Sequence, residues 1–214
     1  MVGLRTQKTT VTQEQLIAWG VASRTLAGQA VSGDLHLVQS FSGGILMAVL
    51  DGIGHGEEAA AAVTAAVAVL QRHPEESPTV LIRRCHAALS NTRGAVMTVA
   101  SLDPLAGELT WVGVGNVEAL LVRADINARP ATERVVLRGG LIGYQLPELR
   151  ASTTAIAAGD LLIFSTDGIR PGFARGLVRT EPPRRIANQI MRQNLKRSDD
   201  ALVLVVRYLG KGDG

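Results

Sequence analysis

The chain has 214 residues, 46% of them hydrophobic and 19% charged, which predicts one folded domain with its own core. Its net charge is only +3, its Lys and Arg residues are spread along the chain, and 3% of its residues are aromatic, so the composition excludes the basic stripe and stacking aromatics of a nucleic-acid-binding protein. No apolar run is long enough to span a membrane, no secretory signal precedes residue 16, and the single Cys85 cannot form an internal disulfide; we therefore expect a cytoplasmic protein with no membrane or nucleic-acid partner.

The first part of the chain predicts strands followed by two helices. Residues 1–15 are polar, and we expect them to be frayed. Three short apolar runs separated by Gly, Asp and Ser predict strands at residues 16–23, 35–41 and 45–50. The Ala-rich run 56–71 is apolar on nearly every side, which indicates a buried helix. Ser77 followed by Pro78 predicts the start of a second helix, which should run to about Asn91 and bury Cys85.

Strands dominate again from Val96 onward. Apolar runs predict them at residues 96–102, 109–114, 118–123, 134–137, 161–165 and 201–209. A helix at 183–195 has Ile186, Ile190 and Met191 at helical spacing, and the basic residues around it favour a solvated face over a surface that docks an acidic partner. Because strands and helices do not alternate regularly, we expect an α+β fold with sheets packed face to face and covered by helices.

Four aspartates stand at predicted strand ends, beside glycine or another aspartate: Asp34, Asp51, Asp167 and Asp199. Apolar strands hold such residues in place, and glycine lets the backbone turn and exposes its carbonyl oxygen. Carboxylates held on rigid strands suit a hard divalent cation. Each aspartate taken alone is equally typical of a turn, so the hypothesis rests on their combination.

Residues 51–56, Asp-Gly-Ile-Gly-His-Gly, also raise the possibility of a dinucleotide-binding loop. That fingerprint needs a third glycine at position 57, where the chain has Glu57. Asp51 and Glu58 would crowd a pyrophosphate with negative charge, and regular strand–helix alternation is missing. We therefore reject this interpretation.

The motifs, taken in order, resemble the PPM family of metal-dependent serine/threonine phosphatases (the type 2C group), and within it the bacterial branch of the sporulation stage II E type. The resemblance extends over nearly the whole chain, and the absence of a sensor segment makes it most similar to the RsbX-type phosphatases of the bacterial stressosome. The segments that carry it are Ser-Gly-Asp at 32–34, the 51–56 motif, Arg-Gly-Ala-Val-Met-Thr at 93–98, Gly-Val-Gly-Asn-Val-Glu-Ala at 113–119, Thr-Asp-Gly at 166–168 and Asp-Asp at 199–200.

The resemblance implies a four-layer α-β-β-α sandwich with two central, mostly antiparallel sheets, and two divalent cations, manganese before magnesium. By motif, Asp51 would bridge both ions and the Gly52 carbonyl would bind one of them. Asp167 and Asp199 would hold the other ion, whereas Asp34 would serve the ion on the Gly52 side, directly or through water. Asp200 is the weaker candidate of its pair, because the family places the ligand first.

The expected reaction is hydrolysis of phosphoserine or phosphothreonine by a water whose pKa a two-metal site lowers. His55 would protonate the leaving oxygen or order a water, or it is only a polar residue at a helix start. No arginine matches the phosphate-gripping arginine of eukaryotic relatives; Arg24, Arg93 and Arg170 are candidates by nearness to motifs. The stretch from Gly168 to Asp199 is short, so a flap over the substrate should be reduced.

The partner implied by the resemblance is a phosphorylated stress-signalling protein, an anti-sigma antagonist or a stressosome component. The alternative function is a catalytically weak or inactive relative that keeps the fold and binds partners. Loss of a metal ligand would mark such a relative, and all four matched aspartates are present, so catalysis is favoured.

Overall fold

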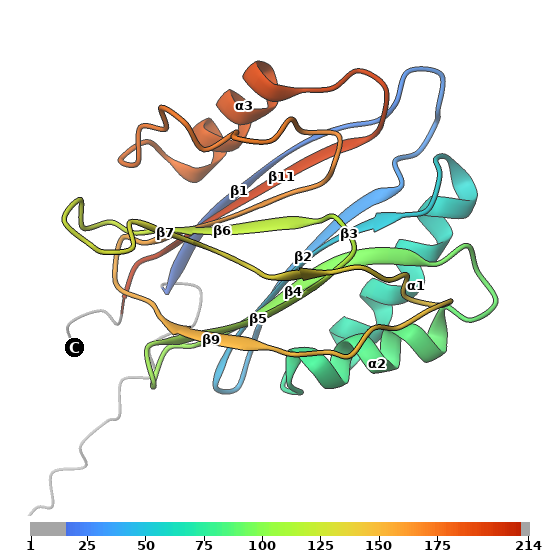
Figure 1. Ribbon diagram of the computed structural model, residues 1–214, viewed down its shortest axis with the longest axis horizontal. Helices are drawn as coiled ribbons and strands as arrows, with labels where there is room; N and C mark the ends of the chain where they lie inside the picture. Colours follow the sequence, from blue (N-terminus) through green and yellow to red (C-terminus); the bar gives the residue numbers. More distant parts are fainter. Residues whose placement is uncertain (1–15, 211–214) are drawn as a thin grey trace, which may run out of the picture.

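The structure, a computed structural model, describes residues 16–210 and contains two β-sheets that lie face to face between helices (Figure 1). The first sheet contains, in spatial order, β1 (Ile17–Arg24), β11 (Ala201–Tyr208), β10 (Leu161–Ser165), β6 (Glu118–Val122) and β7 (Thr132–Arg134). The second sheet contains β2 (Asp34–Phe41), β3 (Gly44–Gly52), β4 (Ala95–Asp103), β5 (Glu108–Val114) and β8 (Leu137–Arg138), and β9 (Ser152–Ala155) also pairs with β5. All neighbouring strands are antiparallel except β5 and β8.

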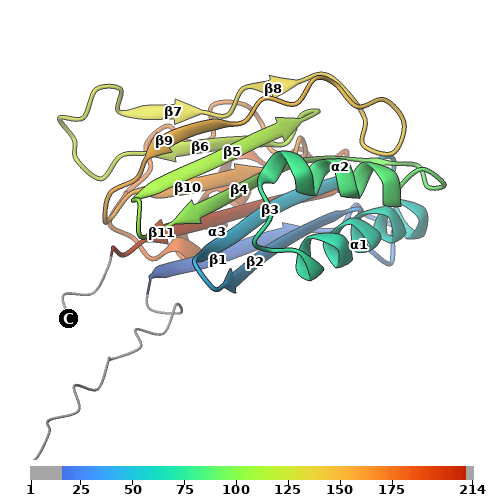
Figure 2. The ribbon, with the colours of Figure 1, turned by 90° about the horizontal axis from the view of Figure 1, so that it is seen from below.

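Helices cover the outer face of each sheet, so the layers run α-β-β-α as expected. Helix α3 (Pro183–Asn194) packs on the first sheet, whereas α1 (Glu57–Arg72) and α2 (Pro78–Ala88) lie together on the second (Figures 1 and 2). Each helix turns its apolar side toward a sheet. The buried side of α1 is mostly alanine, and these small side chains let the helix lie close to the sheet. The α+β sandwich with mostly antiparallel sheets is therefore confirmed.

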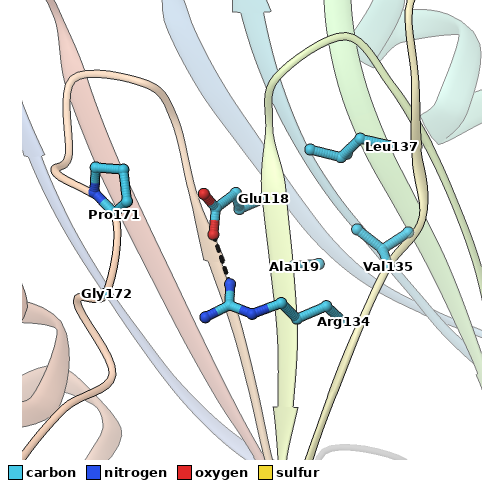
Figure 3. Close-up of a pocket in the computed structure, with 7 residues that line it drawn as sticks. All are labelled: Glu118, Ala119, Arg134, Val135, Leu137, Pro171 and Gly172. Atoms are coloured by element: carbon cyan, nitrogen blue, oxygen red, sulfur yellow. Dashed lines mark hydrogen bonds and ion pairs between the residues drawn. The ribbon is translucent and has the colours of Figure 1, made fainter.

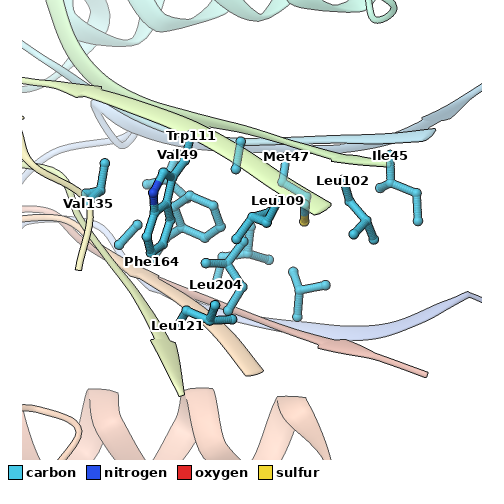
Figure 4. Packing of buried hydrophobic residues seen from close by; sticks show 14 of the residues in the cluster. Ile45, Met47, Val49, Leu102, Leu109, Trp111, Leu121, Val135, Phe164 and Leu204 are labelled. Atoms are coloured by element: carbon cyan, nitrogen blue, oxygen red, sulfur yellow. The ribbon is translucent and has the colours of Figure 1, made fainter. Parts of the chain in front are cut away.

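The interior strands β3 and β11 are buried on both faces, because each lies between the other sheet and a helix layer. In β3, side chains that face the other sheet alternate with side chains that face α1 and α2; the first group is Ile45, Met47 and Val49, and the second is Leu46, Ala48 and Leu50. Trp111 and Phe164 lie between the sheets among these inward residues (Figure 4). Burial on both faces explains why these strands are continuous apolar runs without polar alternation.

Three element predictions need correction. The single strand expected at 134–137 is two strands in different sheets, because Arg134 pairs with Leu120 and Leu137 pairs with Gly113. Strand β9 was not expected, because its polar residues are mostly exposed and form no apolar run. Helix α2 ends at Ala88, before Asn91, and Ser77 occupies its N-cap position without a side-chain bond to the backbone.

Two expectations from composition concern burial and helix length. Cys85 is fully buried, as expected for a small apolar side chain. Among residues 16–210, no helix is long and apolar enough to cross a membrane. The expectation of a frayed segment at 1–15 falls outside the described residues.

Candidate functional site

The four predicted aspartates lie at one end of the sandwich, although they come from distant parts of the sequence. Antiparallel pairing of β2 and β3 places Asp34 directly opposite Asp51. Asp167 follows the end of β10, and Asp199 precedes the start of β11, its antiparallel neighbour, so these two carboxylates also share one end of their sheet. The sheets are joined there by the Thr166 hydroxyl, which donates a hydrogen bond of 2.7 Å to Asp34 Oδ2.

A pocket of about 210 Å³ opens at this end of the molecule. Its walls include most of the residues expected to hold metal or act in catalysis: Asp51, Gly52, His55, Asp167 and Asp199. Asp34 is buried and does not line the pocket. The structure therefore brings the predicted carboxylates together and separates Asp34 from the others as a deeper residue.

Burial raises the pKa of two of these carboxyl groups strongly. The pKa of Asp51 rises to about 8, first through burial and then through repulsion from Asp34, Asp167 and other nearby carboxylates. Burial also raises the pKa of Asp34 to about 7, and the Thr166 hydrogen bond only partly offsets this. These groups face one another without enough positive charge to balance them, which is the electrostatic setting that a divalent cation would relieve.

Opposing effects act on the pKa of Asp167. Burial raises its pKa first, Asp199 raises it further, and the Lys196 ammonium partly counters both. The Asn116 side chain donates a hydrogen bond of 2.9 Å to Asp167 Oδ2 and so orients the carboxylate. Asn116 belongs to the 113–119 motif and Lys196 directly follows the basic helix region, but neither was predicted to act on Asp167.

The donor chemistry of the pocket fits a hydrated divalent cation. Within residues 16–210, no three acidic, histidine or cysteine side chains lie close enough to hold one ion by themselves. Magnesium in proteins keeps several waters and takes only one or two carboxylates, and main-chain carbonyl oxygens complete many such sites. The three pocket carboxylates, the main chain at Gly52 and water together supply such a set.

Two glycines are required by close backbone approaches around the carboxylates. A Cβ at Gly52 would contact the Ala59 carbonyl in the first turn of α1. A Cβ at Gly168 would contact the Asp200 carbonyl oxygen at the start of β11. The Asp-Gly and Thr-Asp-Gly motifs therefore let α1 and β11 pack directly against the residues that follow the two aspartates.

The neighbouring Asp199 and Asp200 have different surroundings. Asp199 is half-buried and lines the pocket. Asp200 is 3% exposed, and its two carboxylate oxygens accept hydrogen bonds of 2.7 Å from the Leu26 and Gly33 backbone N–H groups. Asp200 therefore fastens the β1–β2 loop to the start of β11, a structural role that the sequence analysis did not foresee.

The three candidate arginines occupy different positions. Arg93 forms an ion pair with Glu58, and its Nη1 lies 3.0 Å from where a Cβ would stand on Gly54, a pocket residue. Arg24 is exposed at the end of β1, opposite Ala201. Arg170 is exposed after Thr-Asp-Gly, and its backbone N–H bonds to the Asn194 carbonyl. Of the three, Arg93 has a guanidinium in contact range of the pocket loop.

Comparisons with known proteins show which family the chain resembles. A family model described as Stage II sporulation protein E (SpoIIE) matches residues 42–209. The chain is 25% identical over 176 residues to the phosphoserine phosphatase RsbX of Bacillus subtilis (strain 168), covering 81% of this chain and 85% of that protein.

Solved structures have the same fold. A chain from work on the bacterial stressosome, a modular system adapted to control secondary messenger signaling, is 29% identical with a TM-score of 0.81, covering 89% of this chain and 99% of that one. RsbX in complex with magnesium gives 21% identity and a TM-score of 0.79, covering 90% and 96%. The phosphatase PstP with two manganese ions gives 15% and 0.67, covering 91% and 99%.

Proposed function

Because the chain belongs to the stage II sporulation protein E (SpoIIE) family of PPM phosphatases, we propose that its carboxylate pocket hydrolyses phosphoserine or phosphothreonine on a protein partner. The observation that carries this proposal is the group of buried, mutually repelling carboxylates around one pocket, held by the same motifs that identify the family. Since these residues come from both sheets, we infer that the chain acts as a single phosphatase domain.

We assign the metal ligands as follows. Asp51 and the Gly52 carbonyl would hold one cation, and Asp51 would be shared with a second cation held by Asp167 and Asp199. Asp34 lies deeper and would act through water. The choice of Asp199 over Asp200 is supported by the hydrogen bonds that already occupy both oxygens of Asp200. When bound, two manganese or magnesium ions supply an activated water and neutralise charge on the phosphate.

Three side chains of this protein are suited to the substrate itself. Arg93 lies against the pocket loop and, if it turns from Glu58, can direct two N–H groups toward phosphate oxygens. Lys196, whose ammonium lowers the pKa of Asp167, adds positive charge near that carboxylate. His55 is exposed and lines the pocket, where it can give a proton to the leaving serine oxygen.

We further propose that the partner is a phosphorylated stress-signalling protein, either an anti-sigma antagonist or a stressosome component. This rests on the similarity to the phosphoserine phosphatase RsbX and to the chain from the stressosome work. The pocket opens to solvent, which suits a phosphorylated residue presented on the surface of a folded protein.

The test measures phosphate release from an aryl phosphate and from phosphorylated candidate partners, with manganese and with chelator. Wild-type protein should release phosphate only with metal, and Asp51→Asn should be inactive. The matched control is Asp125→Asn, in an exposed loop after β6, which should keep wild-type activity. If the wild type hydrolyses neither substrate with manganese or magnesium while remaining folded, the chain is an inactive partner-binding relative and the proposal is wrong.

A further inference from the structure

A second, larger hollow lies beside the carboxylate pocket. Its volume is about 400 Å³, and it is bounded by the start of β6, the segment that crosses from β7 to β8, and the loop after β10 (Figure 3). The residues that define it are Glu118, Ala119, Arg134, Val135, Leu137 and Pro171. None of them was singled out by the sequence analysis for binding.

Two short stretches of the protein chain connect the hollow to the reaction site. Glu118 is two residues beyond Asn116, whose side chain holds Asp167. Pro171 is four residues beyond Asp167 itself. Because two residues of extended chain span at most about 7 Å and four at most about 14 Å, a substrate chain with its phosphorylated residue over Asp167 can reach the hollow within two to four residues.

The chemistry of the walls is apolar with one polar pair. Ala119 and Val135 are buried members of the core between the sheets, and Leu137 packs against that core from its edge. Between this side and Pro171, Arg134 Nη1 donates a hydrogen bond of 2.7 Å to Glu118 Oε2 (Figure 3). The Arg134 side chain is 52% exposed, and within the described residues it has no other hydrogen-bond partner, so its remaining N–H groups are available to a backbone carbonyl.

The loop that forms the far wall is held in place. Phe173 is 2% exposed and packs with the residues under α3. The Arg175 N–H bonds to the Gly172 carbonyl, and Arg179 Nη1 donates 2.9 Å to the Arg123 carbonyl. This segment lies in the stretch from Gly168 to Asp199, where the sequence predicts a reduced flap. Its anchoring means that the hollow is formed before substrate arrives, which lowers the cost of binding.

We propose that this hollow is a substrate subsite that receives an apolar side chain two to four residues from the phosphorylated residue of the protein substrate. The inference rests on the proposed phosphatase function. The apolar side chain would lie against Val135, Leu137 and Pro171, and Arg134 would bind a carbonyl of the substrate backbone. The enzyme would therefore choose among protein substrates partly by a side chain that lies two to four residues from the phosphorylated residue.

The experiment uses phosphoserine peptides with alanine at every flanking position except one leucine, moved from position −4 to +4. The measured quantity is kcat/KM of each leucine peptide divided by that of the all-alanine peptide. Wild-type protein should prefer leucine about tenfold or more at one position two to four residues away, as expected for an apolar pocket. Ratios near one at every position would overturn the inference.

Two variants place charge in the hollow, and one places it elsewhere. Pro171→Glu changes an exposed loop residue, and Leu137→Lys changes the opposite wall; each should reduce the leucine preference to near one. Ile126→Asp, at a residue 77% exposed in the loop after β6, should keep both activity and preference.

The outcomes separate the two proposals. A leucine preference that survives both hollow variants, in protein with a wild-type melting temperature, would show that another surface produces it. Failure of the wild type to hydrolyse any peptide or aryl phosphate with manganese would refute the phosphatase function instead.

Discussion

Replacement of Asp51 by asparagine should change how the stability of the metal-free protein depends on pH. The pKa of Asp51 is raised from 3.8 to about 8 in the folded chain, chiefly by burial. Between these two values the folded state keeps a proton that the unfolded state has lost. The contribution of Asp51 to the free energy of unfolding is therefore greatest below pH 4, and it falls as the pH rises toward 8.

The size of the effect follows from the linkage relation. One proton held only by the folded state lowers the free energy of unfolding by about 1.4 kcal/mol per pH unit. Between pH 5 and 7, Asp51 should therefore contribute a loss of about 2.7 kcal/mol, as long as its folded pKa stays above 7. Asparagine cannot ionise, so Asp51→Asn should lack this loss. The variant keeps the contributions of Asp34, whose pKa is about 7, and of Asp167, whose pKa burial also raises.

The assay is urea denaturation with chelator at pH 5, 6 and 7, comparing the difference in unfolding free energy between wild type and variant. This difference cancels all groups that the two proteins share. Asp125→Asn serves as the control, because it retains both buried aspartates and should follow the wild type. If the wild type and Asp51→Asn show parallel pH dependence, Asp51 is not a buried carboxyl with a raised pKa, and the electrostatic argument for a cation there fails.

Three further predictions concern metal, the paired aspartates and phosphate. Manganese should raise the free energy of unfolding by about 2.7 kcal/mol at a hundredfold excess over its dissociation constant, and chelator should abolish activity; a melting temperature that does not respond to manganese contradicts a formed site. Asp199→Asn should lose activity and keep its stability. Asp200→Asn should lower the free energy of unfolding by about 1–3 kcal/mol in urea denaturation, because its amide oxygen can accept from only one of two backbone N–H groups. Equal stabilities of the two variants would contradict the structural role of Asp200. Arg93→Ala should weaken inhibition by inorganic phosphate about tenfold or more while Arg24→Ala does not, and equal inhibition of the two variants would exclude Arg93 from the phosphate site.

Local pattern was enough to predict the central elements of the fold. Strands β3 and β11 were recognisable because burial on two faces demands an unbroken apolar run. Helix α1 was recognisable from its long Ala-rich run without Gly or Pro, although it lies on the outer face of the second sheet and buries only one side. The aspartates were recognisable for a related reason, since a carboxylate next to glycine at the end of an apolar strand is held rigidly. Their convergence remained a hypothesis until the pairing of β2 with β3 and of β10 with β11 was known.

Tertiary structure alone decided how neighbouring residues divide their roles. Asp199 and Asp200 are chemically identical and adjacent. The family motif favoured Asp199 as the ligand, but no local pattern indicated that Asp200 binds the β1–β2 loop. The same holds for residues 134–137, which resemble one strand in sequence but pair with both sheets. As the segment crosses from one sheet to the other, it forms one wall of the hollow. Sequence pattern reports how buried a residue is, because burial selects side-chain type; it does not report which distant backbone N–H needs an acceptor, because that partner is set only when the chain closes on itself.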